Sequence, residues 1–277
     1  DIKKEKDFVI SLKDGRKIHG DRIIIATGGN AAPSTGSDGN GYVLAQKLGH
    51  SIVEFFPGLV QLKLEEDIFS KADGVKFVGT ARIYYKDNLT KEYRGDILFT
   101  NYGISGPPIL QLSRTALEYL KKGKKVKLKV SIIDTKTREE LYEYLQYRFS
   151  FMPRKTIEIG LIGLINKRLI LPILKKIGLD KNKQIAHLNN EEIKKLSTIL
   201  TDLSFNIIGS KSWKDAQVTA GGVSTDEIDS STMESKLVKG LYFAGEVVDV
   251  DGDCGGFNLQ WAWSSGYVAG EEAALSR

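Results

Sequence analysis

The 277-residue sequence is poor in the residues that build disulfides, metal centres and membrane helices. It holds one cysteine, three histidines and two methionines. A single cysteine excludes an intramolecular disulfide, and because no secretory signal is visible we expect a reducing cytoplasm. No apolar stretch reaches the roughly 20 residues that a membrane-spanning helix needs. The best candidate, residues 160–174, is interrupted by polar and charged residues and a proline, so we expect no membrane partner.

The formal net charge of +5 includes one lysine-dense segment, KKGKKVKLKV, at residues 121–130. Nucleic-acid binding by such a segment would favour aromatic residues interleaved with the lysines, and this segment contains none. We interpret it as a solvated edge strand with its lysines facing water, and we expect no nucleic-acid partner. An RNA-associated role through this segment and the domain that carries it stays open as an alternative.

The two ends of the chain share a pattern of strands, glycine-rich loops and a helix, and the middle of the chain has a different pattern. The amino-terminal part predicts three strands, a glycine loop and a helix, with the first two strands joined by a hairpin turn at KDG, residues 13–15. The last section returns to strands, glycine loops and a helix. Short alternating runs, followed by helical periodicity, fill the middle, where the segment NNEEIKKLSTIL predicts a helix with an Asn cap. We predict one α/β domain, residues 1–56 and 214–277, interrupted by an inserted domain at 57–213 that is mainly β over 57–133 and mainly helical over 134–213.

Two strand ends carry residues suited to a ligand. The first, RIIIATGG, is a buried strand that stops at Ala26, Thr27 and Gly28, where bare backbone lets a ligand lie close. The second, GLYFAGE, places Gly245 and Glu246 at the end of another buried strand. A carboxylate there can accept hydrogen bonds from sugar or ribityl hydroxyl groups.

The segment GDCGGFNLQWAWSSGYVAG predicts a helix that opens after two glycines, with its free N–H groups and positive dipole end turned to the loop. Aspartates at every second position before it imitate a calcium loop. However, Cys254 and Gln260 stand where that loop needs glycine and glutamate, so we expect no metal site. We interpret Trp261 and Trp263 as core packing, and Cys254 as an inert structural thiol.

These elements together suit a flavin, which needs bare backbone along its ring, an acid for the ribityl chain, and a helix N-terminus near its pyrimidine oxygen. The segments RIIIATGG, GSDGNGYVLAQKLGH, GDILFTNYGISGPPIL and AQVTAGGV, together with the final glycine motif, resemble the BaiN-like, or aminoacetone oxidase, family of FAD-dependent oxidoreductases. The resemblance implies an FAD/NAD(P)-binding α/β domain of the glutathione-reductase type, interrupted by an inserted β-barrel plus helical domain.

The resemblance also implies a cofactor site, residue by residue. Glu246 is expected near the ribityl or pyrophosphate segment, the last helix start at the isoalloxazine, and the TAGGV turn close to the ring or substrate. The residues are Ala26, Thr27, Gly28, Gly29, Thr219, Gly221, Gly222, Gly245, Glu246, Gly255, Gly256, Phe257, Asn258, Leu259 and Gln260. Asn101 stands where relatives carry histidine, so the catalytic acid or base is unknown. We interpret His19, His50 and His187 as structural or solvated.

One departure from the family matters most. Its amino-terminal G-x-G-x-x-G segment, which binds the FAD pyrophosphate, has no counterpart in this sequence. We therefore expect this chain to retain half of an FAD site and to be inactive alone. In the intact enzyme, electrons or hydride would pass through flavin N5 between a small-molecule substrate and NAD(P)H or the substrate itself as donor. The alternative is a flavin- or nucleotide-binding protein without turnover.

Overall fold

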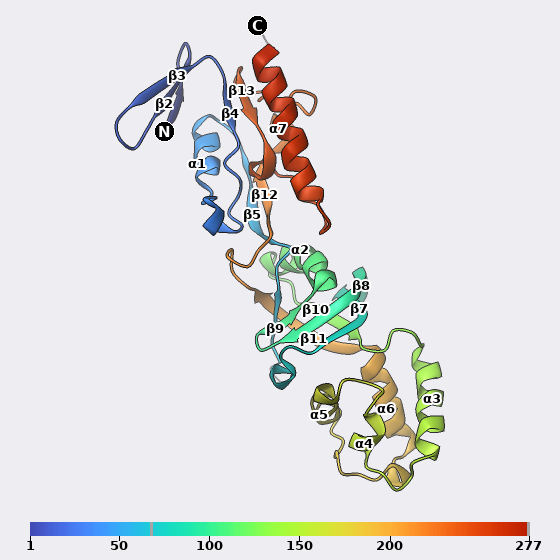
Figure 1. Cartoon of the computed structure of the whole chain (residues 1–277). Helices are drawn as coiled ribbons and strands as arrows, with labels where there is room; N and C mark the ends of the chain where they lie inside the picture. The colour runs from blue at the N-terminus through green and yellow to red at the C-terminus, as the bar shows by residue number, and fades with distance from the viewer. Residues whose placement is uncertain (67–68, 276–277) are drawn as a thin grey trace. The chain divides into compact units, whose positions relative to one another are not determined.

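The computed structural model describes residues 1–66 and 69–275, and the chain divides into two compact units (Figure 1). Unit 1 consists of residues 1–60 and 211–277, and unit 2 of residues 61–210. Among the helices in the described parts of the chain, none is long and apolar enough to cross a membrane.

Unit 1 begins with a three-stranded antiparallel meander. Strand β1 (Ile2–Lys4) pairs with β2 (Phe8–Ser11), which pairs with β3 (Lys17–Gly20). The hairpin predicted from the KDG turn is thus confirmed. Phe8 is buried in the core of unit 1, which fixes the meander to the rest of the unit.

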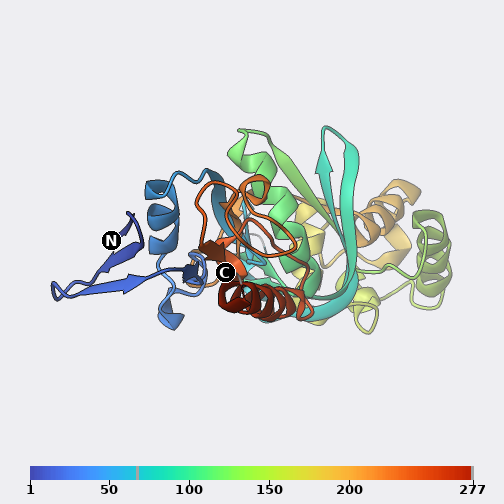
Figure 2. The same ribbon diagram turned by 90° about the horizontal axis from the view of Figure 1, so that it is seen from above.

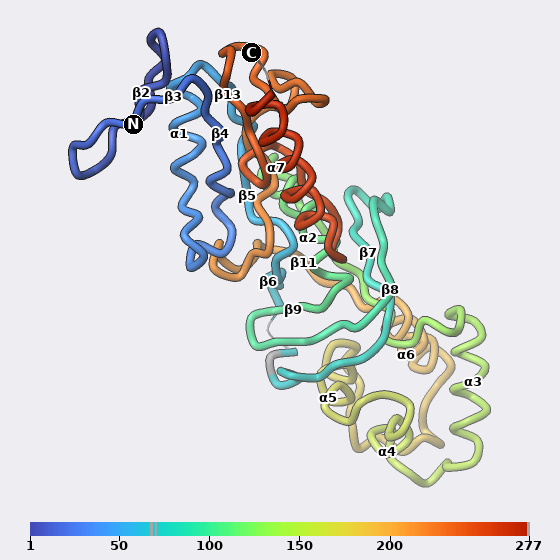
Figure 3. The backbone as a smooth tube through the Cα atoms, turned by 45° about the horizontal axis from the view of Figure 1, so that its top comes forward, coloured from blue at the N-terminus to red at the C-terminus, as the bar shows by residue number. Residues whose placement is uncertain are grey.

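A short parallel pair forms the centre of unit 1. Strand β4 (Ile23–Ile25) pairs in parallel with β13 (Leu241–Phe243), with Ile23 opposite Leu241. Helix α7 (Phe257–Leu275) contacts both strands, and it lies on the side of the pair opposite α1 (Asn40–Lys47) (Figure 1, Figure 2 and Figure 3). All three residues of β13 are buried, as the apolar run predicts.

A second pair of strands in unit 1 is antiparallel. Strand β5 (Ile52–Gly58) pairs with β12 (Val218–Val223), and a bulge between Ala220 and Gly222 shifts their register. Every residue of β12 is buried. Side chains from both pairs and from α1 share one apolar core.

Unit 2 contains a closed antiparallel barrel with the strand order β10-β11-β6-β9-β8-β7. Helix α2 (Pro107–Lys121) packs against it. A cluster of aromatic rings, Phe69, Phe99 and Phe205, fills part of its core. The strands are β6 (Leu62–Leu64), β7 (Lys76–Tyr85), β8 (Asn88–Thr100), β9 (Gly103–Ser105), β10 (Val126–Ser131) and β11 (Leu203–Ser210).

The lysine-rich strand β10 is not an edge strand, so that part of the sequence interpretation is wrong. It pairs with β11 on one side and with β7 on the other, because the barrel closes. The alternation itself holds: Val126, Leu128 and Val130 are buried, whereas Lys127 is exposed. A lysine facing water is compatible with any strand that has one solvated face.

The rest of unit 2 is helical, and its helices are α3 (Arg138–Ser150), α4 (Ile157–Leu161), α5 (Lys167–Lys176) and α6 (Asn190–Thr201). The predicted Asn cap of the NNEEIKKL helix is confirmed at Asn189, whose Oδ1 accepts a hydrogen bond from the N–H of Glu192 at 2.9 Å. The short 3₁₀ turns of the whole chain are η1 (Pro33–Thr35), η2 (Ser70–Ala72), η3 (Ile185–His187), η4 (Thr225–Glu227) and η5 (Gly245–Val247).

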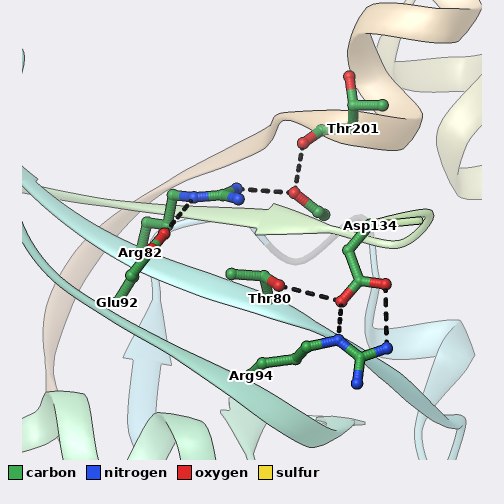
Figure 4. Close-up of polar contacts among 7 residues, drawn as sticks. Thr80, Arg82, Glu92, Arg94, Asp134 and Thr201 are labelled. Carbon is green, nitrogen blue, oxygen red and sulfur yellow. Dashed lines mark hydrogen bonds and ion pairs between the residues drawn. The ribbon is translucent and has the colours of Figure 1, made fainter. Parts of the chain in front are cut away.

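Polar contacts fix the place where the barrel passes into the helical part (Figure 4). Arg94 Nε donates to Asp134 Oδ2 at 2.7 Å, and Thr80 Oγ1 donates to the same oxygen at 3.0 Å. Arg82 Nη1 donates to Ser131 Oγ at 2.7 Å. Asp134 lies three residues after the end of β10, so its carboxylate ties the exit of that strand to β7 and β8.

Candidate functional site

The two strand-end motifs meet at one edge of the parallel pair. Because β4 and β13 run in the same direction and in register, the segments after Ile25 and after Phe243 leave from neighbouring positions. The carboxyl edge of parallel strands is where α/β domains bind their ligands. The amide of Ala244 donates to the carbonyl of Ile25 at 3.1 Å, which extends the pairing into both motifs.

Thr219, on β12, connects three segments that are distant in sequence. Its Oγ1 accepts hydrogen bonds from the backbone N–H of Asn30 at 2.8 Å and of Ala31 at 3.0 Å. Its own backbone N–H donates to Glu246 Oε1 at 2.9 Å. Thr219 is only 1% exposed, so these bonds form away from water, where leaving them unmade is costly.

Gly29 lies inside this junction, and its lack of a side chain is what allows the junction to close. A Cβ atom at this position would lie 2.3 Å from Thr219 Oγ1 and 2.7 Å from Glu246 Oε1. Real Cβ atoms do not approach oxygens so closely. The sequence predicts that Gly29 leaves space for a ligand, and in the structure this space is occupied by the side chains of Thr219 and Glu246.

Tyr42 on α1 is a site residue that the sequence analysis missed. Burial raises the pKa of its hydroxyl, and the negative charge of Glu246 raises it further. Tyr42 is 3% exposed, and the Thr219 side chain beside its hydroxyl lowers the pKa in part. No hydrogen bond of ordinary geometry reaches Tyr42 Oη from residues 1–66 and 69–275. No motif singles it out, because a tyrosine in the first turns of a helix is an ordinary core residue.

Glu246 is the acid at this junction. Burial raises the pKa of its carboxyl group, while the hydrogen bonds from Thr219 work in the opposite direction. Its Oε1 accepts from Thr219, and no residue that the structure describes hydrogen-bonds to its Oε2. A carboxylate oxygen and a buried phenol are thus left for a polar ligand group.

Helix α7 begins in an exposed first turn. Residues 255 to 257 and 259 are exposed, and the first intrahelical bond runs from the N–H of Gln260 to the carbonyl of Gly256 at 2.9 Å. The amides before Gln260 therefore have no acceptor within the helix. Asn258 closes the preceding loop, because its Oδ1 accepts from the N–H of Gly252 at 2.8 Å and its Nδ2 donates to the Gly252 carbonyl at 2.9 Å.

The backbone of Gly245 is held by α7 from both sides. Its N–H donates to Ser265 Oγ at 2.9 Å, and its carbonyl accepts from Trp261 Nε1 at 3.1 Å. Trp261 therefore both packs and orients the strand-end loop. Ser265 was missed as well, because a serine within a helix gives no signal before its partner is known.

The glycines of the TAGGV turn lie inside β12. A Cβ atom on Gly222 would be 2.7 Å from the carbonyl oxygen of Val247, and one on Gly221 would be 2.6 Å from the Cα of Phe55. Both positions allow close approach of the chain to itself, and their role toward a cofactor remains a prediction. Ala26 and Thr27 are exposed after β4, with Gly28 partly so.

His50 is buried and takes part in a separate cluster of unit 1. Its Nε2 lies 2.8 Å from Ser235 Oγ, and its Nδ1 lies 3.1 Å from Glu227 Oε2. The same Ser235 oxygen accepts from the N–H groups of Leu237 and Val238. Burial lowers the pKa of the His50 ring. Because backbone N–H groups already donate to the Ser235 hydroxyl oxygen, we interpret this cluster as a structural contact that holds the His50 ring in place.

The other residues raised by the sequence have surroundings of their own. His19 is exposed and pairs with Asp7 at 2.8 Å, and His187 is exposed on η3. Asn101 belongs to unit 2, where its backbone N–H donates to Asp73 Oδ1 at 3.1 Å. Across residues 1–66 and 69–275, no group of three or more histidine, cysteine, aspartate or glutamate side chains is placed to hold a metal ion.

A parallel pair whose loops gather at one edge, with helices on both sides, is an arrangement that Rossmann-like domains contain. The model of the HI0933-like protein Rossmann domain matches residues 1–272, so the chain belongs to that family. It is 37% identical to the 3-dehydro-bile acid delta(4,6)-reductase of Clostridium scindens over 269 residues, which is 97% of this chain and 66% of the relative. This relative confirms the family predicted from the motifs.

Two further relatives bear another name. The chain is 32% identical to the ribosomal RNA dihydrouridine synthase of Escherichia coli over 275 residues, which covers 99% of this chain and 66% of the relative. It is 33% identical to the protein of the same name from Haemophilus influenzae over 248 residues, or 89% of this chain and 58% of the relative. The chain thus spans about two thirds of the length of these relatives, or less.

Proposed function

We propose that the chain supplies part of the FAD site of an FAD-dependent oxidoreductase. The observation that carries this proposal is the junction of Gly29, Thr219 and Glu246 at the carboxyl edge of the parallel pair, together with the Glu246 Oε2 that accepts no hydrogen bond from the residues the structure describes. The buried Tyr42 hydroxyl lies beside the same carboxylate. Polar groups left unpaired at that edge, and an exposed helix N-terminus in the same unit, suit a ligand with hydroxyls and a group that becomes anionic. The residues present therefore fit a flavin nucleotide.

A bound FAD would supply hydride or electron transfer at N5, with NAD(P)H or the substrate as donor. Glu246 would accept a hydrogen bond from a ribityl hydroxyl, or lie beside the pyrophosphate, with its free Oε2. Its position is fixed by the Thr219 amide at Oε1. The first turn of α7 would place N–H dipoles toward a developing negative charge, and Trp261 and Ser265 would hold Gly245 in place for it.

The names of the relatives suggest the kind of bond that is reduced. A delta(4,6)-reductase acts on carbon–carbon double bonds of a 3-dehydro bile acid, and a dihydrouridine synthase saturates the uracil ring of RNA. In both substrates the double bond is conjugated with a carbonyl group. We extend the proposal to this chemistry: a hydride adds to the carbon remote from the carbonyl, a proton adds to its neighbour, and NAD(P)H is oxidised to NAD(P)⁺.

The test is an anaerobic absorption spectrum of the protein at its full natural length. We expect a yellow protein whose flavin band is bleached by NADH or NADPH and restored by an enone substrate. A flavin that resists reduction by both nicotinamides would favour the second candidate, a flavin-binding protein without turnover. A Glu246→Gln variant should weaken FAD binding about tenfold, which is what loss of one charged hydrogen bond causes. A Glu272→Gln variant on α7 removes the same charge and should not.

A further inference from the structure

A pocket of about 430 Å³ lies on unit 2, where the β7–β8 hairpin approaches the loop between α2 and β10. This volume is within the range of small-molecule sites, and it is enough for one nucleotide unit. Its lining residues are Tyr84, Tyr85, Lys86, Asp87, Gly123, Lys124, Lys125, Lys127 and Asn206. We call it the lysine–tyrosine pocket.

The charge of the pocket is strongly positive, because four lysines and a single aspartate line it. Lys124 and Lys125 are exposed, and neither forms an ion pair with any residue of the described ranges. Lys127 Nζ lies 3.9 Å from Asp87 Oδ1, but that aspartate side chain is 93% exposed, so the pair is weak. The pocket therefore retains most of its positive potential for an anionic ligand.

The fold brings to the lysines the aromatic rings that their own segment lacks. Tyr85 stacks on Tyr119 of α2 with the ring centroids 4.7 Å apart. Lys86 Nζ lies 5.6 Å from the Tyr85 centroid, and Lys129 Nζ lies 4.6 Å from that of Tyr84. The expectation of no nucleic-acid partner depended on the absence of aromatics from residues 121–130. In three dimensions that reason no longer holds.

The tip of the β7–β8 hairpin holds Lys86 at the pocket. Lys86 and Asp87 both have positive φ angles, 48° and 62°, as a tight two-residue hairpin turn requires. Glycine and asparagine adopt this conformation more easily than lysine does. The short turn keeps the lysine at a fixed place beside Tyr85.

We propose that the lysine–tyrosine pocket binds an unpaired segment of RNA, with phosphates at Lys124 and Lys125 and a base against the tyrosines. Lysines and tyrosines suit the two chemical parts of a single strand, its phosphodiester charge and its flat bases. The residues that line the pocket belong to unit 2, whereas the proposed FAD residues belong to unit 1, so RNA binding can be measured on the protein without flavin. Only the further step, that this RNA is the molecule reduced, rests on the proposed function.

The test is fluorescence anisotropy of the protein with a labelled, uridine-rich single-stranded RNA of about 12 nucleotides, within the length that one such surface covers. Affinity is measured from about 50 to about 200 mM salt, without flavin or nicotinamide. We expect the double variant Lys124→Gln/Lys125→Gln to bind about tenfold more weakly at the lowest salt. The slope of log affinity against log salt should fall by about 1.4, because two phosphate contacts are lost.

The matched control is Lys175→Gln/Lys181→Gln, which removes two exposed lysines of the same unit from outside the pocket. It should stay within twofold of the unaltered protein. A Tyr85→Leu variant should lose about tenfold at every salt concentration, since stacking is not screened. Circular dichroism of each variant establishes that unit 2 is still folded.

Several outcomes would overturn the proposal. One is an equal loss in the pocket and control lysine variants, which would show a diffuse charge effect. Another is binding of DNA of the same sequence as tightly as RNA, which would remove the assignment to RNA. Tighter, pocket-dependent binding of polyglutamate or of phosphatidylglycerol vesicles would assign the surface to an acidic protein or a membrane. Failure of RNA binding leaves the flavin spectrum, and with it the proposed function, unaffected.

Discussion

Replacing Thr219 by valine should destabilise unit 1 more than any other change of equal size at the junction. Valine has nearly the same shape as threonine but no oxygen, so the N–H groups of Asn30 and Ala31 lose their acceptor. Ala31 is buried and its amide is left unsatisfied, whereas Asn30 is half-buried and regains some water. An unmade buried hydrogen bond costs about 1–3 kcal/mol, so we expect a loss of about 2–3 kcal/mol in the free energy of unfolding.

The control for this prediction is Thr219→Ser, which keeps the hydroxyl and removes one buried methyl group. That change should cost about 1 kcal/mol through lost apolar burial. Urea unfolding followed by tryptophan fluorescence separates the units, because all three tryptophans, at 213, 261 and 263, belong to unit 1. With an m-value of about 2 kcal/mol/M, the valine variant should unfold at about 1 M lower urea.

Equal stability of the valine and serine variants would refute the reasoning. Loss of the Thr219 hydroxyl would then cost no more than loss of its methyl group. An unchanged midpoint for both would show further that residues 30 and 31 are not tied to β12 in solution. A fall in the midpoint with a changed slope would indicate altered exposure of unit 1 on unfolding, and the free energies would then need calorimetry.

Three further predictions concern other parts of the molecule. Burial lowers the pKa of His50 below its usual 6.5, so the unfolded chain takes up the proton first as pH falls, and unit 1 should lose stability below about pH 6.5. His50→Gln should flatten this pH dependence of the free energy of unfolding, measured by urea titration. Asp134→Ala should cost unit 2 about 2 kcal/mol by circular dichroism, because its side chain is 6% exposed and holds two donors, whereas Glu92→Ala should cost about 0.5 kcal/mol or less. Trp261→Phe should cost about 1 kcal/mol through the lost bond to Gly245, but Trp263→Phe almost nothing, because Trp263 is 67% exposed; similar thermal midpoints for the two would contradict this.

The contrast between the two tryptophans shows where sequence reasoning stops. Both were interpreted as core residues because aromatics in a helix beside a sheet usually serve burial. Trp261 is half-buried and bonded to Gly245, while Trp263, two positions on, faces solvent. A spacing of two residues places side chains on nearly opposite sides of a helix, so one sheet cannot cover both. The helical spacing alone indicates that one of them is exposed, but not which.

Local signals predicted local structure well. The β2–β3 hairpin, the buried β13 strand and the Asn189 cap each follow from a few neighbouring residues whose conformations are coupled directly. Strand β10 shows the limit, because whether a strand is at an edge depends on partners far along the chain. Its two sides pair with β11 (Leu203–Ser210) and β7 (Lys76–Tyr85). No residue within 121–130 indicates that these two strands will be its neighbours.

The junction at Thr219 depends on such distant contacts throughout. Its hydroxyl binds amides 189 and 188 positions away, and its amide binds a carboxylate 27 positions away. The motifs identified Gly29, Thr219 and Glu246 separately as residues facing a cofactor, yet the structure shows that they first contact one another. A change at any of the three should therefore alter protein stability together with ligand affinity. Loss of FAD binding in a Glu246 variant is evidence for the proposed site only when unfolding by urea shows that unit 1 has kept its stability.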